Sequence, residues 1–214
     1  MKATKVVWGA LNEKLIVSYV DGSIRTFDPY DGTELEYAQV QTRTTFNMCF
    51  PLWQVHAKDI NRLCLNKDRT LLLTCSKDYT SKLLDANTLQ VLKTYQTDRP
   101  VNAAVMHPTK EHVILGGGQD AMSVTTTSSN VGKFESRFFH MIYETEFGRV
   151  KGHFGPINAL AINPNGLSYA SGAEDGYVRL HFFDEDYLNK QDEVPDELEE
   201  GSLDPSGGGG DEDN

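Results

Sequence analysis

The chain has 214 residues, of which 39% are hydrophobic and 10% aromatic, enough for one sizeable core or for part of a larger repeat array. Its formal net charge of −11 is unevenly spread, because residues 184–214 hold 13 Asp and Glu against one Lys. The residues before them are close to neutral. The composition therefore excludes the basic surplus that is typical of a dedicated nucleic-acid-binding protein.

The cysteines and the short length of the apolar runs indicate in which cellular compartment the protein lies. Cys49, Cys64 and Cys75 form no CxxC pair, which predicts free thiols in a reducing environment. The N-terminus has no apolar signal-peptide core, and no apolar run approaches the roughly 20 residues that a membrane helix needs. These features predict a cytoplasmic protein without a membrane partner.

Four copies of one unit follow each other along the chain, each with apolar strands, a tight turn containing Asp and a further strand. The first copy spans residues 4–39, with strands in Lys14–Gly22 and Ser23–Asp28. Residues 41–53 are apolar and aromatic and are predicted to be an insertion. The second copy, residues 54–96, begins with His56 and has apolar runs at Ile60–Leu65, Leu71–Cys75, Thr80–Asp85 and Leu89–Tyr95.

The third copy is weaker and the fourth is the clearest. Residues 97–139 contain strands at Val101–Met106 and Val113–Leu115, and residues 133–143 alternate well enough to predict a long outer strand. The fourth copy, residues 150–188, has strands at Pro156–Ile162, Leu167–Gly172 and Tyr177–Phe182.

The aspartates of the tight turns give the period of the repeat. Asp78 and Asp120 are 42 residues apart, within the 40–45 residues of a four-stranded WD-repeat propeller blade. The steps from Asp21 to Asp78 and from Asp120 to Asp175 are longer and indicate insertions. The sequence therefore predicts an all-β WD-repeat β-propeller over residues 1–188.

The C-terminal segment, residues 189–214, has a different composition. It combines acidic residues, two prolines and a run of four glycines. Such a segment buries too little apolar surface to offset the entropy lost on ordering. It is predicted to be a disordered acidic tail. A solvated tail is favoured over one that contacts a basic partner.

Two sets of side chains have the composition of a hydrolase triad. They are His56, Thr74 and Asp78 in the second copy, and His153, Ser171 and Asp175 in the fourth. Both sets repeat in register with the unit, whereas an active site is rarely duplicated once per repeat. We interpret them as turn networks, in which Asp fixes the tight turn and His bridges it to a strand hydroxyl. No catalytic residue is predicted.

Other polar features are also interpreted as structural. One strand position is usually Trp in such repeats. In three copies it holds another residue, Phe27, Leu84 or His181, which predicts that the networks are imperfect. Gly116-Gly-Gly lacks the Lys-Ser/Thr of a phosphate loop and predicts close backbone packing. No metal or cofactor is predicted at the remaining histidines, which lack ligand spacing; they are His107, His112 and His140.

Partner contacts of propellers usually lie on the turns between blades. Charged residues there are expected to be exposed and are our candidates for partner binding. They are Asp59, Lys77, Asp78 and Arg99.

Several stretches resemble a known family. They are Ile114–Gln119, Glu146–Val150, Gly152–Asn158 and Glu174–Arg179, with others between residues 87 and 140. Gly-Gly-Gly-Gln and Gly-His-Phe-Gly-Pro are much more specific than a generic WD repeat. The chain resembles, over roughly residues 4–40 and 54–188, the C-terminal half of subunit I of eukaryotic translation initiation factor three.

The resemblance implies a non-catalytic scaffold in that factor. Such subunits hold the b and g subunits, and so help to bring messenger RNA and initiator tRNA to the small ribosomal subunit, which they contact indirectly. Contacts are mainly to protein, so no direct sequence-specific nucleic-acid binding is expected. The family fold has seven blades, of which this chain would supply about four, leaving an unpaired edge on the last.

Two other interpretations remain open. One is a generic WD-repeat adaptor that acts outside the initiation factor. The other is a non-functional truncated copy.

Overall fold

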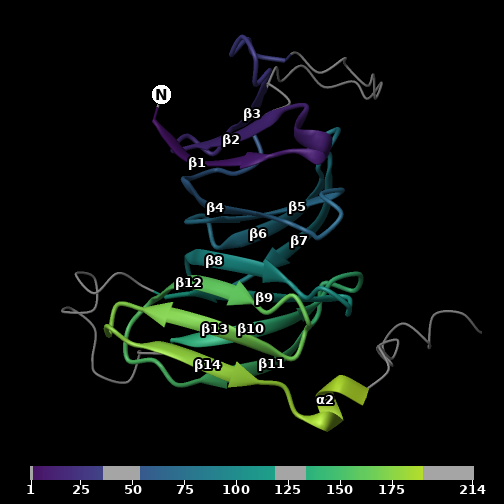
Figure 1. Ribbon diagram of the computed structural model, residues 1–214. Helices are drawn as coiled ribbons and strands as arrows, with labels where there is room; N and C mark the ends of the chain where they lie inside the picture. Colours follow the sequence, from purple (N-terminus) through teal and green to yellow (C-terminus); the bar gives the residue numbers. More distant parts are fainter. Residues whose placement is uncertain (1, 36–53, 119–133, 190–214) are drawn as a thin grey trace, which may run out of the picture.

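Four antiparallel β-sheets make up the computed structural model, which describes residues 2–35, 54–118 and 134–189 (Figure 1). The predicted insertion at 41–53, Asp120 and the tail from 190 onward lie outside the described residues. Figure 1 shows the first sheet above the second and the second above the third, while the fourth lies against the third.

The first two sheets come from the N-terminal half. The first has three strands, β1 (Ala3–Trp8), β2 (Leu15–Tyr19) and β3 (Ile24–Phe27), with the short 3-10 helix η1 (Ala10–Asn12) between β1 and β2. The second has four strands, β4 (Ile60–Leu65), β5 (Leu71–Ser76), β6 (Thr80–Asp85) and β7 (Val91–Gln96). The strands predicted at 60–65 and 80–85 are confirmed.

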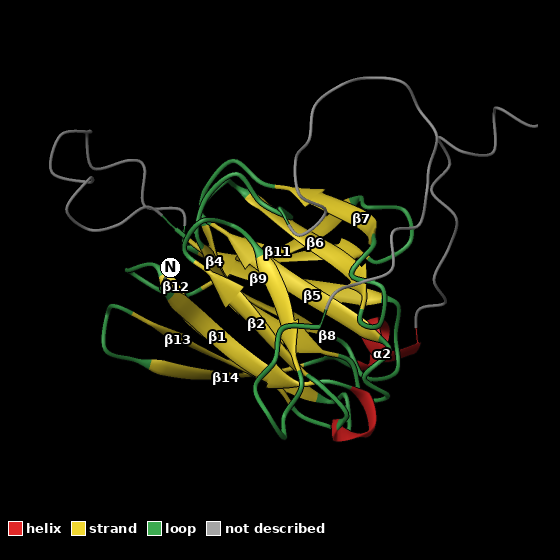
Figure 2. Cartoon of the chain, turned by 90° about the horizontal axis from the view of Figure 1, so that it is seen from above, coloured by secondary structure: helices red, strands yellow, loops and turns green. Residues whose placement is uncertain are grey.

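The other two sheets follow the same plan. The third contains β8 (Val101–Met106), β9 (His112–Gly117), β10 (Glu135–His140) and β11 (Glu146–Lys151). The fourth contains β12 (Ile157–Ile162), β13 (Ser168–Ala173) and β14 (Val178–Phe182), and the helix α2 (Glu185–Asn189) follows it. Seen from above, the sheets overlap and α2 lies at one side of the stack (Figure 2). Neither helix in the described ranges is long and apolar enough to cross a membrane.

The innermost strands β1, β4, β8 and β12 contact each other from sheet to sheet, and each has a β-bulge near its start. The residues at the bulges are Thr4, Asn61, Asn102 and Asn158. Three of them form a row across the sheets. Asn61 Nδ2 donates to Asn102 Oδ1 at 3.2 Å, and Asn102 Nδ2 donates to Asn158 Oδ1 at 2.8 Å. A bulge at the same place in every sheet shows that the four units are structurally equivalent.

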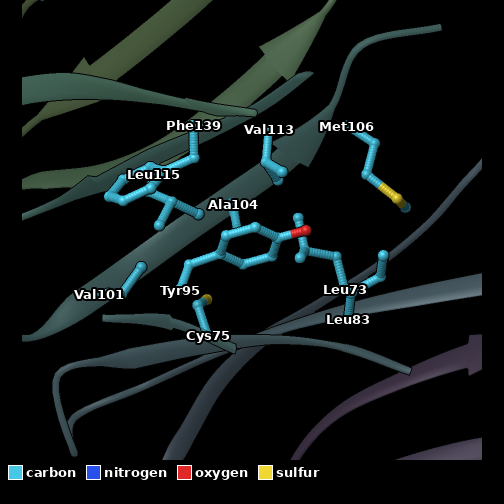
Figure 3. Close-up of a cluster of buried hydrophobic side chains, with 10 residues drawn as sticks. All are labelled: Leu73, Cys75, Leu83, Tyr95, Val101, Ala104, Met106, Val113, Leu115 and Phe139. Atoms are coloured by element: carbon cyan, nitrogen blue, oxygen red, sulfur yellow. The ribbon is translucent and has the colours of Figure 1, made fainter. Parts of the chain in front are cut away.

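Apolar clusters fill the spaces between consecutive sheets. One joins the first two sheets, with Ile16 and Ile24 facing Leu63. A second joins the second and third sheets, and Figure 3 shows the ring of Tyr95 among its side chains. The Tyr95 hydroxyl, at the end of this buried ring, donates to the Met141 carbonyl at 2.9 Å. The third cluster joins the third and fourth sheets. The core is therefore divided into layers, one between each pair of sheets.

The third sheet differs from the sequence prediction. The segment 133–143 is not a long outer strand, because β10 lies between β9 and β11 and all six of its residues are buried. The outer strand is β11, so the sheet continues to Lys151, beyond the predicted end of the repeat at 139. The prediction is wrong because a strand buried on both faces has no exposed side to set its position.

The last sheet ends in an edge. Among the described residues, β14 pairs only with β13, and the unpaired last edge stays a prediction. The sequence did not predict α2. This helix is five residues long, and Tyr187 anchors it to the third sheet through a hydrogen bond with His112 Nδ1 at 2.7 Å.

The layered core makes a prediction about single side chains. Leu83→Ala should lower the free energy of unfolding by about 2–5 kcal/mol, because Leu83 is 4% exposed and packs between two sheets. Leu92→Ala removes the same atoms from the outer strand β7, where Leu92 is 45% exposed, and should change it by about 0.5 kcal/mol or less. Urea unfolding of both variants gives the two values. Equal losses would contradict a core between the sheets.

Candidate functional site: the histidine, hydroxyl and aspartate networks

The structure brings together the three side chains that were predicted to interact in the second sheet. His56 precedes β4, Thr74 lies on β5, and Asp78 lies in the turn between β5 and β6. The Nδ1 atom of His56 is 2.9 Å from Asp78 Oδ2, and its Nε2 atom is 2.7 Å from Thr74 Oγ1. Because an ionised carboxylate only accepts, the proton in the first contact belongs to His56.

The aspartate also holds the backbone. Asp78 Oδ2 accepts the amide of Ala57 at 3.0 Å, and Oδ1 accepts the amide of Thr80 at 3.0 Å and its hydroxyl at 2.6 Å. One carboxylate thus ties the segment before β4 to the turn after β5.

The fourth sheet has the same arrangement. His153 Nδ1 is 3.0 Å from Asp175 Oδ2, and His153 Nε2 is 2.8 Å from Ser171 Oγ. Asp175 accepts the amides of Phe154 at 3.0 Å and Tyr177 at 3.1 Å. In both sheets the histidine and aspartate are 22 residues apart. The two networks are therefore copies of one local structure.

The fourth-sheet network has an additional member that the sequence analysis missed. This member is His181, which occupies the strand position that was expected to leave the network imperfect. Its Nε2 atom lies 3.0 Å from Ser171 Oγ. Burial, with the nearby charges of His153 and Arg179, lowers the pKa of His181, which favours the neutral ring. The prediction of an imperfect network is wrong here, because imidazole replaces the usual indole as a hydrogen-bonding group.

Both aspartates are ionised in the folded protein. Burial by itself raises the pKa of Asp78, but hydrogen bonds from His56 and Thr80 outweigh it and hold the pKa well below 3.8. Burial likewise raises the pKa of Asp175, while the amides of Phe154 and Tyr177 and the ring of His153 lower it to about 2. The networks therefore stabilise the charged carboxylate.

The hydroxyls are inaccessible. Thr74 is 0% exposed and Ser171 is 1% exposed. A hydroxyl nucleophile has to reach a substrate carbon, whereas these oxygens lie inside the sheets. The arrangement holds turns in place and offers no attacking group at the surface.

The corresponding turn of the first sheet is held without a histidine, and that of the third sheet lies outside the described residues. In the first, Asp21 accepts the amide of Ser23 at 3.0 Å and its hydroxyl at 2.6 Å. Elsewhere in the third sheet, Asp98 before β8 forms an ion pair with Arg137 of β10, a contact that the sequence analysis missed. A search of the segment 22 residues before Asp120 would have pointed to Asp98.

The four candidates for partner binding do not share one environment. Lys77 Nζ and Asp59 Oδ2 form an ion pair of 3.0 Å, with side chains 50% and 31% exposed. Asp78 belongs to the turn network, and its side chain is 11% exposed. The Arg99 side chain is 17% exposed and lies 3.4 Å from Asp98. The expectation that all four present exposed charge is wrong for Asp78 and Arg99.

The other histidines hold backbone and neighbouring side chains. His107 Nδ1 accepts the amide of Lys110 at 3.0 Å, while its Nε2 is 3.0 Å from the carbonyl of Gly166 in the fourth sheet. His140 Nδ1 accepts the amide of Ile142 at 3.2 Å. No group of three or more possible metal ligands occurs within the described ranges.

The glycine run is packed closely, as predicted. A Cβ atom on Gly117 would lie 2.0 Å from the Pro100 carbonyl oxygen, and one on Gly116 would lie 2.7 Å from Ile157. Cys64 and Cys75 are free thiols, and burial raises the pKa of both.

Four equivalent antiparallel sheets with two copies of a histidine, hydroxyl and aspartate network define an all-β repeat protein, consistent with a WD-repeat propeller. A family model described as EIF3I matches residues 1–193. The chain belongs to this family of translation initiation factor subunits.

Individual relatives agree with the family. Eukaryotic translation initiation factor 3 subunit I of Bombyx mori is 48% identical over 188 residues, which are 88% of this chain and 53% of the relative. The protein of the same name from Nematostella vectensis is 50% identical over 186 residues, 87% of this chain and 53% of the relative. The human one is 48% identical over 187 residues, with the same coverage. The chain thus spans about half the length of these relatives.

The networks predict a loss of stability when the carboxylate is removed. Asp78→Ala should lower the free energy of unfolding by about 1–3 kcal/mol, because His56 and the amides of Ala57 and Thr80 lose their acceptor. Asp68→Ala, in the exposed turn between β4 and β5, should change it by about 0.5 kcal/mol or less. Urea unfolding measures both. A loss no larger than that of the control would refute the structural role.

The networks also predict the response to acid. The pKa of Asp175 is about 2 in the folded protein and near 3.8 when unfolded, so unfolding takes up a proton between these values. Stability from this group is complete above 3.8 and is lost as the pH falls towards 2. Urea unfolding at about pH 5 and about pH 2.5 should give a shallower pH dependence for the Asp78→Asn, Asp175→Asn double variant than for the unmodified chain. Identical slopes would contradict the assignment.

Proposed function

We propose that this chain is a non-catalytic scaffold subunit of eukaryotic translation initiation factor three in the cytoplasm. In this role it holds the b and g subunits, and through them supports recruitment of messenger RNA and initiator tRNA to the small ribosomal subunit. Its contacts are to protein, with no direct sequence-specific binding to nucleic acid and none to membrane. Family membership is the single observation that carries this proposal.

The interior of the molecule supports a scaffold over an enzyme. The side chains that resemble a hydrolase triad are used to fix turns, and their hydroxyls are at most 1% exposed. Each carboxylate accepts two backbone amides, so its charge serves the backbone. A repeat protein held in this way presents rigid turns, which suit protein contacts.

Asp59 and Lys77 are the exposed charges proposed to contact the b subunit. They lie on neighbouring turns of the second sheet and pair with each other at 3.0 Å. Exposed charges at the rim of an interface mainly affect the association rate and its dependence on salt. Asp78 and Arg99 are weaker candidates for this contact, because their side chains are only 11% and 17% exposed.

The function is tested by co-purification. The tagged chain should co-purify with the b and g subunits and sediment with small ribosomal subunits. Lys77→Glu should slow association with the b subunit and lower the free energy of unfolding by about 1 kcal/mol or less, because the ion pair that it breaks is exposed.

A charge swap distinguishes an effect on partner binding from an effect on the stability of the fold. Asp59→Lys with Lys77→Glu keeps an ion pair within the chain but reverses both charges towards a partner. The swap should remain slow to bind. Unchanged binding of both variants removes these residues from the interface. A stable, folded chain absent from the initiation factor fractions would instead favour an adaptor with another role.

A further inference from the structure

The turn between β12 and β13 contains a pair of residues with a chemistry of its own. The pair is Asn165 and Gly166, the one place in the 214-residue sequence where glycine follows asparagine. The backbone nitrogen after an asparagine can attack the carbon of the side-chain amide. Glycine favours this attack, because it has no Cβ atom to hinder the approach. Among the asparagines of the chain, Asn165 thus has the sequence context that favours this reaction most.

The exposure of Asn165 is a property of the turn itself. The same turn occurs in the second, third and fourth sheets, where the amide of its first residue donates to the carbonyl five residues later. The pairs are Asn66 and Leu71 at 3.1 Å, His107 and His112 at 2.9 Å, and Asn163 and Ser168 at 2.9 Å. Asp68 and Thr109 correspond to Asn165 by this register. Both are exposed, although their sheets have a neighbour on each side.

Hydrogen bonds of the turn hold the reacting atoms near each other. The Leu167 amide donates to Asn165 Oδ1 at 2.9 Å, which closes a ring that contains both Asn165 Cγ and the Gly166 nitrogen. The same amide is directed at the oxygen on which negative charge develops during the attack, as in an oxyanion hole. The Gly166 amide donates to the Asn163 carbonyl at 2.8 Å. The attack therefore requires only that this one hydrogen bond opens.

We propose that Asn165 is a modification site, at which the folded chain converts asparagine to aspartate or isoaspartate. The Gly166 nitrogen gives up its proton to solvent and bonds to Asn165 Cγ, while the bond from Cγ to the side-chain nitrogen breaks and that nitrogen takes up a proton and leaves as ammonia. Water then opens the five-membered imide. Opening at Cγ gives aspartate, and opening at the main-chain carbonyl gives isoaspartate. This inference goes beyond the proposed scaffold role and does not depend on it.

The two products have different effects on the contact between the third and fourth sheets. Aspartate suits the turn, because the second sheet has Asp68 at this position and a carboxylate also accepts the Leu167 amide. Isoaspartate adds one carbon atom to the main chain directly before Gly166. The carbonyl of Gly166 lies 3.0 Å from His107 Nε2, and a Cβ atom on Gly166 would lie 2.9 Å from His107 Cε1. Isoaspartate therefore displaces a closely packed residue and loosens this contact.

Peptide mapping of the folded chain tests the site. Trypsin releases residues 152–179 as one peptide with two internal controls, Asn158, which precedes an alanine, and Asn163, which precedes a proline without an N–H group. The folded chain is incubated at mildly alkaline pH until a synthetic peptide of the same residues has converted. Mass spectrometry should then find acid at Asn165 and none at the controls. Intact Asn165 in the folded chain, or equally fast conversion of Asn158, overturns the proposal.

Melting temperatures test the loosening of the contact between sheets. Reacted chain carries an additional negative charge, so ion exchange separates it from unreacted chain, and peptide mapping gives its isoaspartate content. Asn165→Asp is the matched control, because it adds the same charge without lengthening the main chain. This variant should keep the melting temperature of the unmodified chain, whereas reacted chain that contains isoaspartate should melt at a lower temperature. Equal melting temperatures for the isoaspartate-containing chain and the variant overturn the loosening.

Discussion

Face-to-face packing of apolar sheet surfaces is the interaction on which the rest of this structure depends. Each sheet is too small to bury its own side chains, and its core consists of residues donated by two neighbours. This packing sets the spacing of the innermost strands, which in turn brings Asn61, Asn102 and Asn158 within hydrogen-bonding distance of one another.

The histidine, hydroxyl and aspartate networks solve a different problem. The turns between strands expose amides that no strand can satisfy, and the carboxylates of Asp78 and Asp175 accept them. A charged acceptor makes a stronger hydrogen bond than a neutral one, and the buried histidine holds it in position. The chemistry that resembles a triad is therefore used to stabilise turns, and this agrees with membership of a family of initiation factor subunits.

The sequence predicted those parts of the fold in which the local residue pattern is enough to define the structure. The strands at 60–65 and 80–85 were found because alternation and turn residues agree there, and the two networks because their spacing repeats. The strand at 135–140 was misplaced because residues 133–143 alternate like a strand with one exposed face, whereas all six residues of β10 are buried. The Asp98–Arg137 pair and the anchoring of α2 by Tyr187 were missed because their partners are 39 and 75 residues apart in sequence. His181 was missed because only Trp was expected to complete the network at its position.

Hydrogen exchange at two amides tests most directly whether the networks fix the turns. Ala57 and Phe154 have exposed side chains, Phe154 at 84%, and their amides donate to Asp78 and Asp175. At neutral pH both amides should exchange as slowly as those of neighbouring strands, and should lose this protection when the aspartates are replaced by alanine. Exchange at the rate of an unstructured peptide in the unmodified chain would contradict the account.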